Sequence, residues 1–508
     1  MPRYFPDIEG FLAAARDAEI VPVYRQLLAD HLTPVTAFEL LGRGEHALLL
    51  ESVVGNEKIG RYSFIAASPT AVYQVKDGQA TVRHRSARPW AAGQEVPWQS
   101  VRRFETADPL ADLAALLGQR RYHRDRNLPA FTGGLVGYAG YDTIRYYERE
   151  KLPDAPPDDR GLPDVLMGLY DALVIFDQVD KTIKVVANAD VTQGASVAYN
   201  QATARVDALV DRLSQPVTGR LGEIDPHGPV NLEFTSNMSR EAFEQVVRRG
   251  KEYIRAGDIF QFVPSQRLRV VSRADPFDVY RALRVINPSP FMFYLKAPEC
   301  TLIGASPEIL CQVVDRQVTS RPLAGTRRRG ATEAEDKRLE EELLADPKER
   351  AEHIMLVDLH RNDVGRVSKI GSVKVDDVMT VERYSHVMHI TTNVTGTLDD
   401  QYTALDALRV SLPVGTVSGA PKIRAMQIID SVEPTRRGPY GGAVGYVDLA
   451  GNMAMCIALR TIVWHNAAFD IQVGCGVVAD SVPETEYEET MSKARALLKA
   501  VEIGERGF

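Results

Sequence analysis

Two pairs of glutamates, each with its members three residues apart, are the side chains in this sequence best suited to act together. Glu349 and Glu352 form one pair, and Glu486 and Glu489 form the other near the C-terminus. Residues three apart in a helix share a face, so each pair concentrates negative charge. Four carboxylates on two helices suit a hard cation with oxygen ligands, and we expect Mg²⁺ because it keeps water and substrate oxygens in its shell. Taken singly, either pair is more typical of a solvated helix face.

Both pairs need helices to position them, and the sequence marks where those helices begin. Asp346 is the expected N-cap of the first helix, Pro347 its first residue, and Glu349 the reciprocal partner of a capping box. Residues 354–359 are almost wholly apolar, so we expect this helix to be buried. Pro483 opens the second helix. Buried carboxylates would require a cation or a proton to balance them.

The composition is that of an ordinary soluble globular protein. The net charge of −8 argues against general nucleic-acid binding, so anionic ligands must meet local Arg, Lys or backbone N–H groups. The four cysteines show no C-x-x-C spacing, which indicates neither a disulfide framework nor a zinc site. The N-terminus lacks a signal pattern, and no uncharged apolar run reaches membrane-spanning length. We therefore expect a cytoplasmic protein.

Strand-rich segments with interspersed helices predict an α+β fold built on large antiparallel sheets. The segment 215–231 lacks periodicity, which divides the chain into expected domains at 1–214 and 232–508. Gly133, Gly134, Gly137 and Gly140 fit no phosphate-binding loop and indicate close backbone packing in a sheet. The main elements expected are hairpins or strands at 47–53, 62–82, 172–188, 259–271, 291–321, 440–448, 453–464 and 469–478, and helices at 108–119, 195–213, 239–255, 276–287, 332–345, 347–361, 402–411, 420–430 and 484–501.

Several ordered motifs accompany the glutamates, namely Asn287–Tyr294, Gly304–Glu308, Arg321–Arg327, Val357–Asp363 and Gly415–Lys422. Together they resemble the chorismate-utilising enzymes, and within that family they are most similar to the large, aminating subunits that make anthranilate. The resemblance covers nearly the whole chain. It implies two large antiparallel sheets packed with outer helices, plus an N-terminal regulatory region.

The resemblance also implies where metal and substrate bind. It places the Mg²⁺ ligands at Glu352 and Glu489, with Glu349 and Glu486 holding the metal's waters. Chorismate is a dianion, so one carboxylate can bind Mg²⁺ while the other needs a fixed cation such as Arg460. The implied chorismate contacts are Gly325, Thr326, Tyr440, Arg460, Gly474, Cys475 and Gly476, of which Cys475 replaces the family's usual alanine. Glycines at 474 and 476 would let backbone N–H groups approach carboxylate oxygens, although a simple bulge or turn is an alternative.

His389 matches the family's catalytic histidine, and Thr416 matches a position that contacts the substrate. A lone histidine is more often structural, but the implied role is proton transfer during loss of the ring hydroxyl. Ala324 and Gln261 stand where related enzymes carry lysines that attack the ring or activate water. Neither alanine nor glutamine can do this, so ammonia is the expected nucleophile and anthranilate the expected product.

A tryptophan feedback site is also implied, at Ser52 together with Pro290, Phe291 and Met292, where Phe291 replaces the more usual tyrosine. The neighbouring residues 48–51 are equally typical of an ordinary core strand. No glutaminase motif is present, so ammonia would come from solution or from a separate glutamine amidotransferase subunit. Two other functions remain open: another chorismate aminase, making aminodeoxychorismate or aminodeoxyisochorismate, and a non-catalytic tryptophan-binding regulator.

Overall fold

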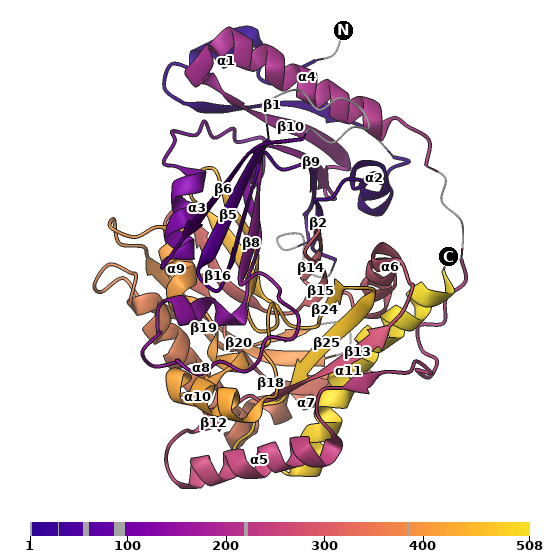
Figure 1. The fold of residues 1–508 in the computed structure, drawn as a ribbon, viewed down its shortest axis with the longest axis vertical. Helices are drawn as coiled ribbons and strands as arrows, with labels where there is room; N and C mark the ends of the chain where they lie inside the picture. The colour runs from indigo at the N-terminus through magenta and orange to yellow at the C-terminus, as the bar shows by residue number, and fades with distance from the viewer. Residues whose placement is uncertain are drawn as a thin grey trace.

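Two large antiparallel sheets stacked face to face, with helices on their outer faces, make up the fold (Figure 1). The computed structural model describes residues 3–28, 30–53, 60–85, 97–217, 222–383 and 387–507. Every pairing between the named strands of this part of the chain is antiparallel, as expected for the α+β class. None of its helices is both long and apolar enough to cross a membrane.

The first sheet has 11 strands. Their order across the sheet is β1 (Ile20–Leu27), β10 (Thr182–Asp190), β9 (Ala172–Asp177), β3 (Tyr62–Ala67), β2 (Ala47–Glu51), β14 (Phe291–Lys296), β15 (Thr301–Ser306), β24 (Thr461–His465), β25 (Ala468–Gly474), β13 (Ser265–Val271) and β11 (Thr235–Ser236).

The second sheet has 12 strands. Their order is β18 (Leu323–Arg328), β20 (Val387–Thr397), β17 (Gln317–Ser320), β16 (Ile309–Val314), β23 (Met453–Ile457), β22 (Ala443–Asp448), β7 (Gly134–Ala139), β8 (Val165–Tyr170), β4 (Ala71–Lys76), β5 (Gln79–Arg85) and β6 (Trp98–Glu105), with β19 (Lys374–Arg383) also paired to β20. A short separate pair joins β12 (Gln261–Phe262) to β21 (Gly419–Ala420).

The helices sort by the sheet face that they cover. The first sheet packs mainly against α1 (Ile8–Ala14), α2 (Pro34–Leu41), α4 (Ala195–Leu213), α6 (Pro276–Ile286) and α11 (Pro483–Arg506). The second packs mainly against α3 (Pro109–Leu117), α7 (Glu333–Ala345), α8 (Pro347–Gly365) and α9 (Ala404–Ser411). A further cluster joins α5 (Arg240–Arg255) and α10 (Lys422–Val432). Short 3₁₀ turns are η1 (Tyr141–Tyr146), η2 (Val191–Gln193) and η3 (Gly415–Val417).

Local sequence signals explain many of these boundaries. The β4–β5 hairpin turns at Asp77-Gly78, where both residues have positive φ (47° and 81°), as a tight hairpin turn requires. Asp275 caps α6 by accepting a hydrogen bond from the Phe277 N–H. The strand expected at 259–271 is divided, because its first part leaves the large sheet to form β12.

Helix α8 begins as expected but is not buried. Asp346 accepts hydrogen bonds from the first turn of the helix, whereas Glu349 accepts one from Arg327 and so does not complete the predicted capping box. The prediction of a fully buried helix is wrong: its inner face packs on β18 and β20, while Ile354 points outward and is 56% exposed. An apolar run therefore covers both faces of a helix that has only one buried face.

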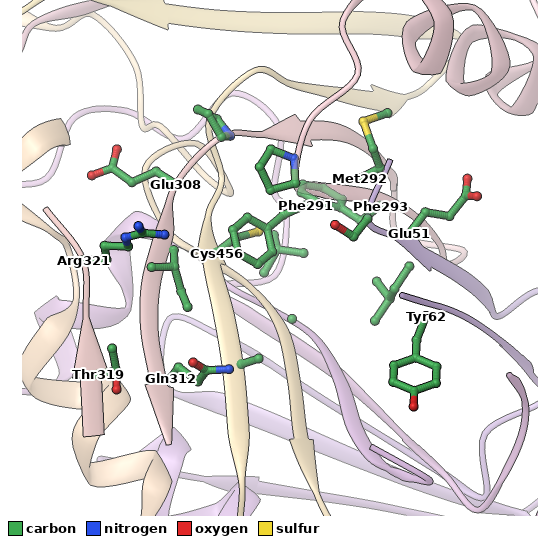
Figure 2. A pocket seen from close by; sticks show the side chains of 18 of the residues that line it. Glu51, Tyr62, Phe291, Met292, Phe293, Glu308, Gln312, Thr319, Arg321 and Cys456 are labelled. Carbon is green, nitrogen blue, oxygen red and sulfur yellow. The ribbon is translucent and has the colours of Figure 1, made fainter. Parts of the chain in front are cut away.

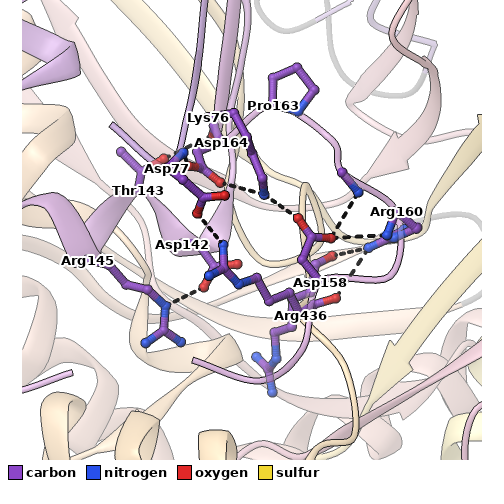
Figure 3. A network of polar contacts seen from close by, with 12 residues as sticks. Lys76, Asp77, Asp142, Thr143, Arg145, Asp158, Arg160, Pro163, Asp164 and Arg436 are labelled. Atoms are coloured by element: carbon purple, nitrogen blue, oxygen red, sulfur yellow. Dashed lines mark hydrogen bonds and ion pairs between the residues drawn. The ribbon is translucent and has the colours of Figure 1, made fainter. Parts of the chain in front are cut away.

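Both sheets contain strands from the two sequence ranges expected as domains. The first sheet joins them where β2 pairs with β14, and the second where β7 pairs with β22. The Pro- and Asp-rich loop at 151–164 adds polar ties (Figure 3). Within it, Arg160 donates a hydrogen bond to the Arg437 carbonyl of the second range at 2.8 Å, while Asp158 holds the loop to Lys76 of the first range. The two ranges are thus structurally interlocked.

The glycines of the 133–140 segment lie where strands pack closely, as predicted. A Cβ atom on Gly137 would lie 2.0 Å from the Leu166 carbonyl oxygen of the paired strand β8. Real Cβ atoms do not approach backbone atoms so closely, so a side chain here would force β7 and β8 apart.

We expect Gly137→Ala to lower the free energy of unfolding by about 1–3 kcal/mol, the usual cost of overpacking. The change should appear as a lower thermal midpoint by circular dichroism. Gly365→Ala is the matched control, since its Cβ would meet no atom within 4 Å. Equal midpoints for the two variants would contradict this assignment.

Candidate active site

The two helices that carry the glutamate pairs bring them to one region of the molecule. Burial raises the pKa of Glu352, and the carboxylates of Glu349 and Glu486 add to the rise, while Lys348 opposes it. Burial likewise raises the pKa of Glu486, with Glu489 adding to it. The four carboxylates therefore repel one another across the two helices, and a cation bound between them would lower this repulsion.

Two of these glutamates are held by cations of the chain itself. Arg327 donates to Glu349 Oε1 at 3.0 Å, and Lys493 Nζ lies 2.8 Å from Glu489 Oε1. Among the described residues, no three His, Cys, Asp or Glu side chains converge closely enough to bind a metal ion. The donor set matches Mg²⁺ in charge and ligand type, although in this arrangement Arg327 and Lys493 occupy two of the four carboxylates.

His389 lies on β20, opposite Thr326 of β18. Its Nδ1 is 2.9 Å from the Gly325 carbonyl oxygen and 3.1 Å from Thr326 Oγ1. A carbonyl only accepts hydrogen bonds, so Nδ1 carries the proton and Nε2 is the basic nitrogen of the neutral ring. Burial lowers the pKa of His389, and Arg460 lowers it further while the Gly325 contact opposes this. The side chain is therefore neutral near pH 7 and able to accept a proton.

Predicted substrate contacts surround this histidine. Arg460 is close enough to His389 to lower its pKa, and its guanidinium donates a hydrogen bond to Asn287 Oδ1 at 3.5 Å. Its backbone has a φ of +47°, a conformation that non-glycine residues adopt at some energetic cost. Gly325 also has positive φ (+68°), and a Cβ there would lie 3.1 Å from Glu349 Oε2. His389 therefore lies near Arg460, and Gly325, which contacts His389, lies beside Glu349.

The glycine-rich end of β25 forms the opposite wall. A Cβ on Gly474 would lie 2.9 Å from the Tyr440 hydroxyl, and one on Gly476 would lie 2.6 Å from Gln261 Nε2. Lys493 donates to the Gly474 carbonyl at 2.9 Å and so ties this wall to α11. The glycines here let Pro264, Tyr440 and Gln261 pack directly against this backbone, in space that a side chain would need.

Glu308 is a site residue that the sequence analysis did not single out. It follows β15 and is buried, and burial raises its pKa to about 8, so the carboxyl is protonated at neutral pH. The Thr416 hydroxyl lies beside it without reaching hydrogen-bond geometry. Glu308 Oε1, Thr416 Oγ1 and Gln261 Oε1 are all buried and find no hydrogen-bond partner among the described residues. The run Ile309-Leu310-Cys311 after Glu308 was the available signal for a buried carboxyl.

The residues predicted to bind tryptophan line one end of a cavity of about 1220 Å³ between the sheets (Figure 2). Met292 of β14 pairs with Glu51 of β2, which brings Ser52 beside Pro290 and Phe291. The Ser52 hydroxyl is buried and without a hydrogen-bond partner in the described part of the chain. An aromatic wall is added by Phe64, Phe131 and Tyr446, and the ring centroids of stacked Phe131 and Tyr446 are 4.1 Å apart. An apolar wall with a few polar groups is typical of a small-molecule site.

A family model described as chorismate binding enzyme matches residues 47–499. Anthranilate synthase component 1 of Aquifex aeolicus is 45% identical over 499 residues, covering 98% of each chain, and that of Pseudomonas aeruginosa is 46% identical over 501 residues, covering 98% of this chain and 99% of its own. Anthranilate synthase component I of Streptococcus pneumoniae superposes with a TM-score of 0.74 at 35% identity, over 93% of this chain and 98% of its own. A menaquinone-specific isochorismate synthase of Escherichia coli, 16% identical with a TM-score of 0.65, shares the fold.

These likenesses extend over the residues that form the site, and the chain belongs to the chorismate-binding enzymes. Within them it belongs with the anthranilate synthase component I proteins, and it is an enzyme of the lyase class.

The shifted pKa of Glu308 predicts a pH-dependent cost to stability. Between the unshifted value of 4.5 and about 8, the unfolded chain ionises this carboxyl while the folded chain keeps it protonated. Stability is therefore lost as pH rises through this window and levels off above it. We expect Glu308→Gln, which cannot ionise, to gain stability relative to wild type by a few kcal/mol between these limits.

Chemical unfolding of both proteins at each end of the window measures this change. A stability difference that does not depend on pH would show that Glu308 titrates normally.

Proposed function

We propose that this enzyme converts chorismate and ammonia to anthranilate, pyruvate and water, as component I of an anthranilate synthase. The observation that carries the proposal is the 44–46% identity to proteins of that name along almost the whole chain. The site chemistry agrees with it, because Ala324 and Gln261 offer no lysine at the positions where other chorismate enzymes would carry one. Ammonia is then the nucleophile.

Amination at C2 requires loss of the C4 hydroxyl as water, and two groups of the site can move the protons. Protonated Glu308 can give its proton to the departing hydroxyl, and neutral His389 can accept one through Nε2. Elimination of pyruvate then breaks the enol-ether bond and aromatises the ring. Arg460 supplies a fixed positive charge for one substrate carboxylate, and backbone N–H groups near Gly474 and Gly476 would bind further oxygens.

Glu352 and Glu489, with Glu349 and Glu486 beside them, would hold Mg²⁺, which would supply positive charge to offset the four glutamates and a substrate carboxylate. Arg327 and Lys493, which pair with two of these glutamates, must give way to it. We further propose that a glutamine amidotransferase subunit supplies ammonia, because relatives carry the name component 1 and the sequence shows no glutaminase motif.

The direct test mixes purified protein with chorismate, Mg²⁺ and ammonium, and follows anthranilate by fluorescence and pyruvate by a coupled assay. Both products should form in equal amounts. Amination without pyruvate release would favour the alternative that this chain is an aminodeoxychorismate or aminodeoxyisochorismate synthase. Turnover with glutamine should need an added amidotransferase subunit, and glutamine-dependent turnover by the single chain would contradict that part of the proposal.

Removing one charge from the glutamate set should weaken metal binding. We expect Glu352→Gln to lower turnover by about two orders of magnitude or more, in line with loss of a group that places the substrate, and to raise the Mg²⁺ concentration for half-maximal rate. Glu484→Gln is the matched control, since Glu484 lies on the same helix as Glu489 but pairs with Arg248 at the surface. Unchanged Mg²⁺ dependence in Glu352→Gln would remove this site assignment.

Tryptophan feedback is the regulatory part of the proposal. We expect tryptophan to inhibit the wild type, and Ser52→Phe to relieve inhibition by filling the cavity end while uninhibited turnover stays near wild type. Typical allosteric couplings are about 5–150-fold. Ser52→Ala, which loses only the hydroxyl, should lie between the two proteins in a tryptophan titration. Equal inhibition of wild type and Ser52→Phe would place the site elsewhere.

A further inference from the structure

A buried ion pair lies behind the walls of the active site. Glu433 follows α10, and Arg437 lies four residues further on, with both side chains only 2% exposed. Two hydrogen bonds join them, from Arg437 Nη2 to Glu433 Oε1 at 2.5 Å and from Nε to Oε2 at 2.9 Å. Replacing such pairs with apolar residues is often neutral or stabilising, so stability alone is a weak reason for this one.

The remaining donors of Arg437 reach two segments that carry site residues. Nη1 donates to the Val417 carbonyl at 2.6 Å, and Nη2 donates to the Val263 carbonyl at 2.6 Å. Val417 directly follows Thr416, and Val263 lies two residues after Gln261. The planar guanidinium thus fixes the spacing of two backbone segments, η3 and the link between β12 and β13, that lie beside unpartnered polar atoms of the site.

Glu433 ties a third segment, and the face of the guanidinium packs on a fourth. Glu433 Oε1 accepts hydrogen bonds from Ser265 N at 2.7 Å and Oγ at 2.9 Å, and Ser265 pairs with Gly474 across β13 and β25. The Arg437 guanidinium carbon lies 5.7 Å from the ring centre of Tyr440. The pair therefore contacts the backbone or side chain behind Thr416, Gln261, Gly474 and Tyr440.

We propose that Arg437 and Glu433 act as a positioning pair that sets the distances between the walls of the chorismate site. The inference rests on the proposed function, because it concerns the same substrate and reaction. The pair reaches neither solvent nor ligand and acts through the groups that it holds. A displacement of about 1 Å in such groups can cost on the order of 100-fold in rate.

The test compares Glu433→Gln with Glu502→Gln. Glu502 forms another buried ion pair, with Lys499 at 2.8 Å, whose other contacts are to Pro229, Asn231 and Arg506 and so lie away from the site segments. Both substitutions keep the side-chain volume and remove one buried charge, so each should lower the thermal midpoint. Steady-state kinetics with chorismate and ammonium are then measured at a temperature at which both variants are folded.

We expect Glu433→Gln to lower kcat/KM for chorismate by roughly 10–100-fold, with a raised KM contributing to the loss, while Glu502→Gln stays within about twofold of wild type. Arg437→Lys should lose activity too, because one ammonium cannot bridge both carbonyls and the carboxylate. Ser265→Ala removes the hydroxyl's hydrogen bond to Glu433 and the one that it accepts from Gln472, but keeps the backbone N–H bond to Glu433. It should raise KM severalfold, and it carries the test if Glu433→Gln does not fold.

Retention of wild-type kcat and KM by Glu433→Gln or Ser265→Ala would overturn the inference, as would equal activity losses in Glu433→Gln and Glu502→Gln. A wild-type protein that makes no anthranilate would instead overturn the proposed function, and this inference with it. The two failures are therefore distinguishable.

Discussion

Two strand pairings, β2 with β14 and β7 with β22, are the constraint on which the rest of this structure depends. Each places a strand from the first half of the chain beside one from the second half in the middle of a large sheet. Backbone hydrogen bonds in a sheet interior cannot be left unmade without a large cost, so the halves cannot separate while the fold persists. The interior between the sheets is consequently built by both halves, and its cavity has walls from each.

The same interior sets the chemistry of the site through burial. Removing Glu308 from water makes it a protonated acid at neutral pH, whereas removing His389 from water makes it a neutral base. One physical cause thus shifts two pKa values in opposite directions, which suits the proposed acid at Glu308 and the proposed base at His389. The glutamates of α8 and α11 differ from both, because these carboxylates lie near one another and their mutual repulsion would be lowered by a bound cation.

Much of the fold follows from local patterns in the sequence. The Asp77-Gly78 turn, the proline-led helices and the α+β class were all predictable, because each depends on residues close together in the chain. The strand that carries His389 was not predicted, although its Val, Ile and Thr residues favour a β-strand. The exposure of Ile354 could not be read from composition, since it depends on which face of α8 meets the sheet. The resemblance supplied the site residues, but the role of Glu308 required its burial to be known.

The strand register also explains how a ligand in the cavity could affect catalysis. Phe291 lines the cavity and pairs with Ser306, two residues before Glu308, while the neighbouring Ala305 N–H donates to the Arg460 carbonyl at 3.1 Å. Asn287, just before the same strand, accepts a hydrogen bond from the Arg460 side chain. A ligand that binds one placement of β14 better than another would therefore bias the positions of Glu308 and Arg460 together. Because binding free energies are linked, a ligand that weakens chorismate binding would itself be bound more weakly, by the same factor, when chorismate is present.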